Sequence, residues 1–325
     1  MPVIASSSYK APALFRLRHV QTVYPTLFRK VPRVAYQRER LELEDGDFLD
    51  LDWSCPNAPC GHLAVVCHGL ESNADSHYMR GMVHALNEVG IGTVCINFRG
   101  CSGEPNRLLR SYHSGASDDV RSVLDHVRQR KREVGKSCSI SLIGFSLGGN
   151  VVLKCLGEGE GLEQVVSAVV FSVPCDLEAS AKRLASGLNQ IYMRRFIKSM
   201  VAKLRMKNEL LGAGFEIAHF EKMRTFAEFD GAYTAPAHGY QSAEDYWQAC
   251  SSRYFLDSIR IPTLLVNAAD DPFLGPECFP REAISSHPHV YLEVPRFGGH
   301  VGFISTNSKK RYWHETRTVE FLAMF

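Results

Sequence analysis

Short apolar runs alternate with amphipathic segments along most of the chain. The runs predicted to form buried strands are 62–69, 91–100, 139–146, 165–174, 261–270 and 289–297. The segments whose apolar residues recur at helical spacing are 77–89, 118–134, 147–156, 278–286 and 312–324. Strands that are apolar throughout are typical of a sheet covered on both faces. Their alternation with helices predicts βαβ units, a mostly parallel sheet and an α/β fold.

Two segments depart from this alternation. Residues 33–54 alternate apolar and polar side chains around Glu44-Asp45-Gly46-Asp47, a pattern that predicts a β-hairpin. The stretch 177–254 contains several helical patterns and no buried strand. The expected parts are an N-terminal arm at 1–31, an α/β core at 32–176 and 255–325, and a helical cap inserted at 177–254. Because the cap leaves the carboxyl end of a strand, it is placed to cover the crevice where open α/β sheets bind ligands.

The first part of the cap is basic and amphipathic. Between Glu178 and Glu209 there are eight Lys or Arg residues and no acidic residue. Its apolar positions form two helical faces that do not align, so a break is expected near Met193–Arg195. We interpret the apolar faces as a cover over an acyl pocket and prefer a solvated surface for the charges. Contact between the basic side and anionic head groups at a membrane surface stays an alternative.

Composition excludes several classes of protein. The 325 residues carry 37 Lys and Arg against 35 Asp and Glu, and a net charge of +2 argues against a bulk nucleic-acid binder. No apolar run approaches the roughly 20 residues that span a bilayer, and no secretory signal is evident. The ten cysteines show no metal-site spacing and are expected to be reduced thiols of a cytoplasmic protein. The oligomeric state cannot be inferred from these patterns.

The strongest chemical signal is Gly144-Phe145-Ser146-Leu147-Gly148-Gly149, which joins a predicted strand to a predicted helix. A sharp turn in this context exposes the hydroxyl of Ser146 above the sheet, and the glycines let neighbouring backbone approach. The Leu147 N–H, at a helix N-terminus, is placed to stabilise an oxyanion. We therefore predict that Ser146 is a nucleophile.

A serine hydroxyl needs a base, and that base needs an orienting carboxylate. His300 lies in a glycine-rich loop just after the last predicted strand, and we choose it as the base. Asp271, in the loop after the preceding strand, is our choice for the carboxylate. Asp270 is a competitor, and Asp176 is a more distant third option.

A second oxyanion amide is expected from the loop that follows the first predicted strand of the parallel sheet. His68-Gly69-Leu70-Glu71-Ser72 occupies this position. We assign the Leu70 N–H, with the Glu71 N–H as the alternative, and expect His68 to brace the loop. Tyr112 and His113 are candidates to line the pocket. The sequence has no phosphate-binding loop, no HExxH and no dinucleotide fingerprint, so no cofactor or metal is expected.

These motifs together resemble the YheT-like family of the α/β-hydrolase superfamily, and the resemblance covers nearly all of the chain. It is carried by the segments 18–22, 68–72, 97–103, 112–115, 144–150, 229–231, 239–240, 242–246, 267–273 and 298–302. The chain order Ser146, Asp271, His300 is that of α/β hydrolases. The resemblance implies a serine esterase or lipase acting on acyl esters, some members on glycerides or phospholipids.

The expected function is hydrolysis of carboxylic esters with short to medium acyl chains through an acyl-enzyme. The expected partner is a small-molecule acyl ester. An acyltransferase that passes the same acyl group to an alcohol is the alternative. A binding module on a hydrolase scaffold is disfavoured by the complete set of Ser, His and Asp.

Overall fold

The structure is a computed structural model that describes residues 2–55, 60–133, 135, 137–306 and 310–325. Its strands are β1 (Val3–Ile4), β2 (Gln37–Glu42), β3 (Phe48–Ser54), β4 (His62–Cys67), β5 (Gly92–Asn97), β6 (Ser139–Phe145), β7 (Val165–Phe171), β8 (Thr263–Val266) and β9 (Val290–Glu293). Across the described residues they form one sheet in the order β1-β9-β8-β7-β6-β4-β5-β3-β2. Of the strand pairs in the described residues, only β2–β3 and β3–β5 are antiparallel. The α/β class, the mostly parallel sheet and the hairpin are confirmed.

The helices of the structure include the five predicted for the core, in the predicted order and at approximately the predicted positions, and one in the N-terminal arm that was not predicted. They are α1 (Arg18–Phe28), α2 (His77–Asn87), α3 (Ser117–Glu133), α4 (Leu147–Glu158), α5 (Leu177–Leu184), α6 (Gln190–Leu211), α7 (Ile217–Glu221), α8 (Phe226–Phe229), α9 (Ala235–Ala237), α10 (Ala243–Cys250), α11 (Arg281–Ile284) and α12 (Trp313–Leu322). Short 3₁₀ helices lie at Ala13–Phe15, Gly187–Asn189, Ser252–Tyr254, Leu256–Ser258 and Pro276–Cys278, and a π-helical turn at Asp230–Thr234. Met1 of the predicted arm and Val134 of the predicted 118–134 helix lie outside the described residues.

The apolar runs are strands because both of their faces are covered. In β4, Val65 packs into the core cluster that contains Val123 and Val151, which belong to α3 and α4. Its neighbour Val66 packs on the opposite face, in the cluster with Met82 of α2. Successive side chains point to opposite faces of a strand, so a strand between two helical layers must be apolar at every position. Because helices cover both faces of the sheet, a functional site is expected in the loops at the ends of the strands.

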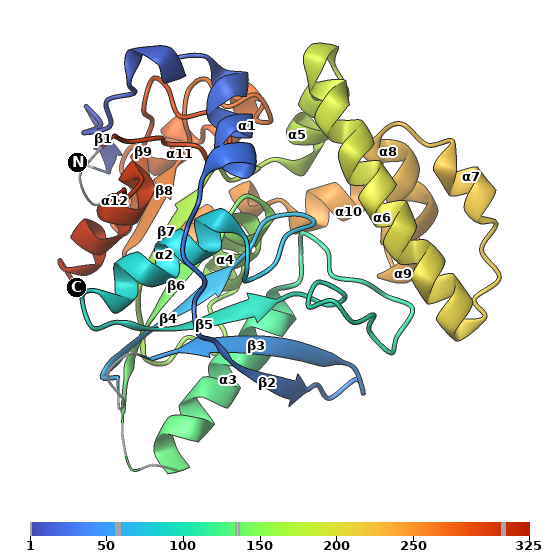
Figure 1. Ribbon diagram of the computed structural model, residues 1–325, viewed down its shortest axis with the longest axis horizontal. Coiled ribbons are helices and arrows are strands. Elements are labelled where there is room, and N and C mark those ends of the chain that lie inside the picture. Colours follow the sequence, from blue (N-terminus) through green and yellow to red (C-terminus); the bar gives the residue numbers. More distant parts are fainter. Residues whose placement is uncertain (1, 56–59, 134, 136, 307–309) are drawn as a thin grey trace.

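The N-terminal arm adds to both the sheet and the rim of the site. β1 pairs in parallel with β9 and forms one edge of the sheet. α1 then lies over the segment that follows β9, as Figure 1 shows at the top of the molecule. The segment 29–36 leads down to β2. The arm is therefore tied to the C-terminal part of the core rather than to the residues next to it in sequence.

The inserted segment forms a group of helices, α5 to α10, beside the carboxyl ends of the strands (Figure 1). The break expected near Met193–Arg195 is wrong, because α6 runs without interruption from Gln190 to Leu211. The chain breaks earlier, where Gly187 takes a positive φ of 55° between α5 and α6. The first of the two apolar faces expected in the cap consists of Leu184, Leu188, Ile191 and Tyr192. Leu188 and Ile191 are exposed, so these four residues do not form one packed face.

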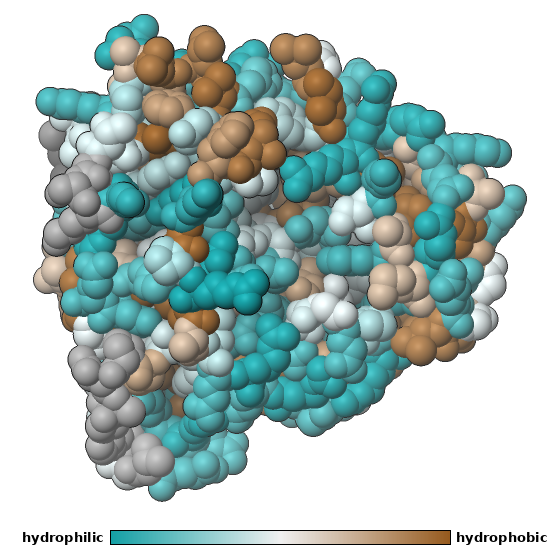
Figure 2. Space-filling model, in the orientation of Figure 1, coloured by the Kyte–Doolittle hydropathy of each residue, from teal (hydrophilic) through white to brown (hydrophobic). Residues whose placement is uncertain are grey.

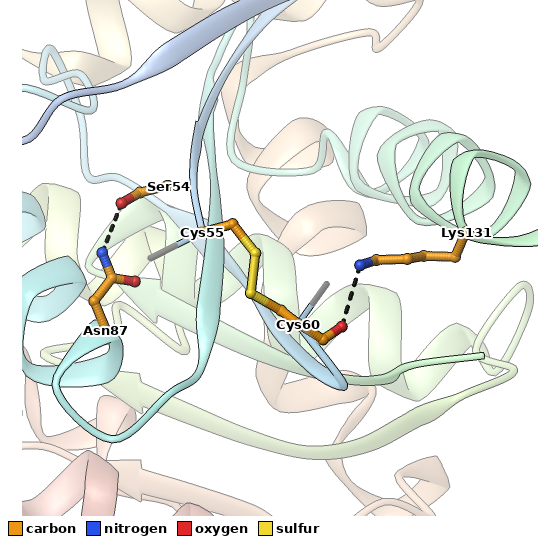
Figure 3. Close-up of a disulfide and its surroundings, with 5 residues drawn as sticks. All are labelled: Ser54, Cys55, Cys60, Asn87 and Lys131. Carbon is orange, nitrogen blue, oxygen red and sulfur yellow. Dashed lines mark hydrogen bonds between the residues drawn. A yellow bond between two sulfur atoms is a disulfide. The ribbon is translucent and has the colours of Figure 1, made fainter. Parts of the chain in front are cut away.

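One disulfide corrects the expectation that all ten cysteines are reduced. Cys55 at the end of β3 and Cys60 just before β4 are bonded (Figure 3), and the other eight cysteines are free and buried. The Cα atoms of Cys55 and Cys60 are 6.5 Å apart, inside the range for a disulfide. A five-residue separation matches no motif, so sequence reasoning missed the bond. Lys131 of α3 donates a hydrogen bond to the Cys60 carbonyl (3.1 Å), which ties this corner to the helix layer.

The described residues contain neither a membrane-spanning helix nor a cluster of metal ligands. Each helix in this part of the chain is too short or too polar to cross a lipid bilayer. The same residues hold no group of three or more His, Cys, Asp or Glu side chains arranged to bind a metal ion.

Candidate active site

Ser146 occupies the sharp turn between β6 and α4. Its backbone has φ 51° and ψ −120°, a strained conformation for a non-glycine residue, and its N–H donates to the Phe171 carbonyl of β7 (2.8 Å). A Cβ on Gly148 would lie 2.5 Å from the Cys67 carbonyl oxygen, and one on Gly144 would lie 2.6 Å from the Gly149 Cα. The glycines around Ser146 are therefore required by close backbone approach, as their spacing predicted.

The loop after β9 brings His300 to this serine. Its Nε2 lies 2.9 Å from the Ser146 Oγ, across 154 residues of sequence. The imidazole packs against the Phe273 ring, with 4.1 Å between ring centroids. The His300 N–H donates to the Thr22 Oγ1 of α1 (3.0 Å), so the arm fixes the loop that carries the imidazole. The 2.9 Å separation between the Ser146 Oγ and the His300 Nε2 is short enough for proton transfer from the hydroxyl to the imidazole.

Asp271 is the carboxylate that meets the imidazole. The Nδ1 of His300 lies 2.9 Å from Oδ2 and 3.1 Å from Oδ1 of Asp271, which is 4% exposed. The Phe273 N–H donates to the same carboxylate (2.9 Å) and fixes its orientation. The chain therefore brings Ser146, His300 and Asp271 into one line of hydrogen bonds.

The two competing carboxylates lie elsewhere. Asp270 accepts a hydrogen bond from the Gly299 N–H (3.0 Å) and so braces the His300 loop. Burial raises its pKa to about 6, and the neighbouring Asp271 charge adds to the rise. Asp176 caps α5 through the Ala179 N–H and pairs with Arg253. Within the described part of the chain, neither of these carboxylates forms a hydrogen bond with His300, so the structure favours Asp271 over both.

The loop after β4 passes directly over the serine. A Cβ on Gly69 would lie 3.2 Å from the Ser146 Cβ. The Gly69 N–H donates to the Tyr78 hydroxyl (3.0 Å), and the Glu71 N–H donates to the Tyr112 hydroxyl (2.7 Å). Among the described residues, no hydrogen bond uses the Leu70 N–H. The alternative donor, Glu71, is thus already engaged, and Leu70 is the loop amide left to bind a ligand oxygen.

Leu147 is the first residue of α4, where helix N–H groups have no partner within the helix. His68 braces the opposite loop, as expected, from a buried position. Burial lowers its pKa to about 4, and its Nε2 accepts from the Phe98 N–H (3.2 Å). The other ring nitrogen therefore carries the proton and donates to the Gly69 carbonyl (2.7 Å).

A set of contacts that sequence reasoning missed ties this loop to the cap. The Glu71 carboxylate accepts from the Tyr112 hydroxyl (2.9 Å) and from the Lys203 Nζ of α6 (3.0 Å). Ser199, one turn earlier in α6, donates to the other carboxylate oxygen. Glu71 has a positive φ of 54°, so the peptide next to Leu70 is held in an uncommon conformation. Lys203 is one of the eight basic residues between Glu178 and Glu209, but no sequence pattern connects it to Glu71.

A cavity of about 110 Å³ extends from Ser146 between the core and the cap. Apolar side chains of the cap line most of it, among them Leu177, Leu184, Phe196, Met200 and Phe226. Tyr112 and His113, the two candidates from sequence, line it as well, with Asp230, Tyr246 and Trp247 at its polar part. The apolar lining suits the hydrocarbon part of a ligand.

A second depression reaches the same serine from outside. This groove, of about 310 Å³, is lined on one side by Thr22, Thr26 and Leu27 of α1. On the other side lie residues of α6, including Arg195 and Phe196. Ser146 and His300 line both the cavity and the groove. A ligand can therefore place one part on each side of the Ser146 hydroxyl.

A mostly parallel sheet and a serine on a strand–turn–helix, opposite a histidine after the last strand, define the α/β-hydrolase class. A family model described as alpha/beta hydrolase fold matches residues 65–306. The chain is 39% identical to "Putative esterase YheT" of Escherichia coli (strain K12), over 94% of this chain and 90% of that protein. It belongs to the α/β-hydrolase family and, within it, to the YheT-like branch.

More distant relatives agree with this family. Phospholipase ABHD3 of Homo sapiens is 28% identical, over 93% of this chain and 75% of that protein. The solved structure of the Pyrococcus furiosus esterase Pf2001 superposes with a TM-score of 0.59, covering 91% of this chain and 98% of that one. At 18% identity this likeness shows the fold alone.

Proposed function

We propose that this ester hydrolase of the α/β-hydrolase family cleaves carboxylic esters through Ser146, His300 and Asp271. The observation that carries the proposal is the line of hydrogen bonds from the Ser146 Oγ to His300 (2.9 Å) and on to Asp271 (2.9 Å). Ser146 also lines the apolar cavity, together with Leu70 and Leu147. A hydroxyl, a base and an orienting carboxylate in this geometry form the machinery of nucleophilic acyl transfer.

The chemistry proceeds through an acyl-enzyme. The Ser146 Oγ attacks the ester carbon while His300 takes its proton, and the carbonyl oxygen becomes an oxyanion. The Leu70 and Leu147 N–H groups stabilise that charge. His300 then gives the proton to the leaving alcohol as the C–O bond breaks, while Asp271 stabilises the imidazolium. Water, deprotonated by His300, releases the acid and restores the Ser146 hydroxyl.

The two depressions suggest how the substrate is divided. The apolar cavity accepts the acyl chain, and its volume of about 110 Å³ favours short to medium chains. The groove, which opens past α1 and α6, accepts the alcohol part. Glycerides and phospholipids have this form, with an apolar chain and a polar alcohol on either side of the ester. The phospholipase name of the human relative supports the same substrate class.

The test is covalent labelling of the serine. A fluorophosphonate probe should label the protein, and Ser146→Ala should abolish both labelling and the turnover of p-nitrophenyl esters. Ser180→Ala is the control, because Ser180 lines the same cavity but bonds to the Cys278 thiol instead of a histidine. Full turnover by Ser146→Ala would reject the mechanism. Added alcohol distinguishes acyl transfer from hydrolysis, since a transferase forms a new ester faster than the free acid.

We also propose that the protein resides in the cytoplasm. Eight of its ten cysteines are free thiols, which fits a reducing compartment, whereas the Cys55–Cys60 bond alone would favour an oxidising one. Cell fractionation with acid-quenched thiol labelling tests this, and recovery in the periplasmic or secreted fraction would contradict it.

A further inference from the structure

Large apolar side chains are exposed on two segments that lie far apart in sequence. The first is the arm around α1, where Leu17 is 67% and Phe28 is 63% exposed. The second is the start of α6, where Leu188 is 69% and Ile191 is 67% exposed. Figure 2 shows apolar side chains gathered over α1 and over the upper end of α6, on the same side of the molecule. Packing does not account for these residues, because most of each side chain is open to solvent.

The same two segments carry unbalanced positive charge. All 35 Asp and Glu residues lie outside residues 1–33 and 179–208. Exposed Arg or Lys side chains stand beside the apolar ones, namely Arg16, Arg18, Lys30, Arg194, Arg195 and Lys198. Within the described part of the chain, none of these six cations forms an ion pair, although many other Arg residues do. The charges are therefore available to an external partner.

The two segments form one surface around the entrance to the site. The groove that leads to Ser146 has α1 on one side, through Thr22 and Leu27, and α6 on the other, through Arg195. The His19 ring and the Tyr192 hydroxyl bridge the two helices with a 3.1 Å hydrogen bond. We call this the entrance surface: the exposed apolar and basic side chains of residues 14–30 and 188–198.

We propose that the entrance surface docks onto an anionic phospholipid bilayer, so that an ester lying in the bilayer faces the groove directly. A bilayer surface binds proteins that expose apolar and basic side chains together. The Leu and Phe side chains bury apolar area among the lipid chains, and the Arg and Lys side chains are attracted to the lipid phosphates. The charge also argues against a second copy of this chain, because two entrance surfaces would bring like charges together. The docking step itself stands without the proposed function, whereas delivery of an ester to Ser146 rests on it.

The binding test uses the full chain carrying Ser146→Ala, so that lipid is not consumed. This protein should sediment with vesicles of equal parts phosphatidylcholine and phosphatidylglycerol, and much less with phosphatidylcholine alone. Lys198→Glu should weaken that binding by about tenfold, because reversal removes one attraction and adds one repulsion. Phe28→Ser should weaken it by a similar factor. The matched controls are Lys222→Glu and Phe325→Ser, at exposed positions away from the entrance surface, and they should bind as the parent does.

The activity test uses the same substitutions with Ser146 intact. A soluble short-chain ester should be turned over at the unchanged rate, whereas an ester presented in the anionic vesicles should be hydrolysed about tenfold more slowly by Lys198→Glu or Phe28→Ser. Equal binding to neutral and anionic vesicles, or equal loss in the control variants, would overturn the docking proposal. So would self-association that Phe28→Ser abolishes, because the surface would then join two copies. Vesicle binding without labelling of Ser146 would sink the proposed function and leave the docking intact.

Discussion

The ion pair between Glu71 and Lys203 gives the sharpest prediction, because it links the cap to the residue next to Leu70, whose amide we propose as an oxyanion donor. Lys203→Met keeps the length of the side chain and removes its charge. Glu71 then retains its contacts with Tyr112 and Ser199 but loses its cation. Since Glu71 follows Leu70 directly in a strained conformation, we expect the Leu70 amide to lose its fixed direction.

The size of the effect follows from burial. The Glu71 side chain is 7% exposed and that of Lys203 is 31%, so the pair is screened on one side only. A partly buried charged contact of this kind is worth about 1–3 kcal/mol, more than an exposed pair and less than a fully buried one. Full transmission to the transition state would lower kcat by about 10- to 100-fold. Loss of a whole oxyanion donor, about 10²- to 10³-fold, sets the upper limit.

The assay measures kcat and KM separately on a soluble ester. Because an oxyanion donor acts on the transition state and not on the bound ester, kcat should fall while KM stays unchanged. Glu71→Gln, which keeps an acceptor for Tyr112, should show a smaller fall. Lys222→Met, on an exposed cap lysine outside the ion pairs, is the control. If Lys203→Met lowers the melting temperature but leaves kcat intact, the pair only holds the cap in place and the reasoning is wrong.

Two further predictions concern stability. Burial raises the pKa of Asp270 to about 6 from 3.8, so the native state binds this proton more tightly and its stability falls as pH rises from about 4 to about 6. Asp270→Asn should remove that fall. In urea unfolding, the free energy of unfolding should rise by about 1–2 kcal/mol above pH 6 and should not change below about pH 4. A gain in unfolding free energy that does not depend on pH would contradict the assignment of the raised pKa to Asp270. Asn150, fully buried, makes three hydrogen bonds to backbone groups of the core and the cap junction. Asn150→Ala should cost about 2–4 kcal/mol of unfolding free energy, whereas Asn150→Asp should cost more, because it places a charge beside two carbonyls; a loss under 1 kcal/mol would show that water replaces these bonds.

The strands of the parallel core could be placed along the chain because their sequences satisfy one strong constraint, whereas β1 and the order of the strands in the sheet were not predicted. A strand between two helix layers must be apolar throughout, so runs such as 139–145 stand out from their surroundings. Ser146 and His300 were predictable for a related reason, since each follows such a run at a fixed place in the fold. Asp271 was preferred to Asp270 from the sequence, and the geometry favours the same residue, because Asp271 meets the His300 imidazole whereas Asp270 accepts from the Gly299 N–H.

What sequence reasoning missed depends on contacts between distant segments. The break in the cap is set by Gly187 and by the exposure of Leu188, and helical periodicity alone cannot tell an exposed leucine from a packed one. The Cys55–Cys60 bond depends on how β3 and β4 enter the sheet on either side of β5. The sequence pattern of a single helix or strand indicates which of its residues are buried. The break in the cap and the disulfide depend instead on how two separate elements are placed relative to each other.

The arm around α1 shows how far such contacts extend. A Cβ on Gly299 would lie 2.7 Å from the Arg18 carbonyl oxygen, and one on Gly302 would lie 2.4 Å from that of Gln21. The His300 loop is therefore packed against the backbone of α1, and the hydrogen bond to Thr22 fixes His300, which follows Gly299 directly. The outer face of α1 also belongs to the entrance surface. The same helix therefore holds His300, the proposed catalytic base, and lines the groove that leads to Ser146. Displacement of α1 on a lipid surface would then move His300 as well. Docking would therefore change the distance between His300 and Ser146, and with it the rate of ester cleavage.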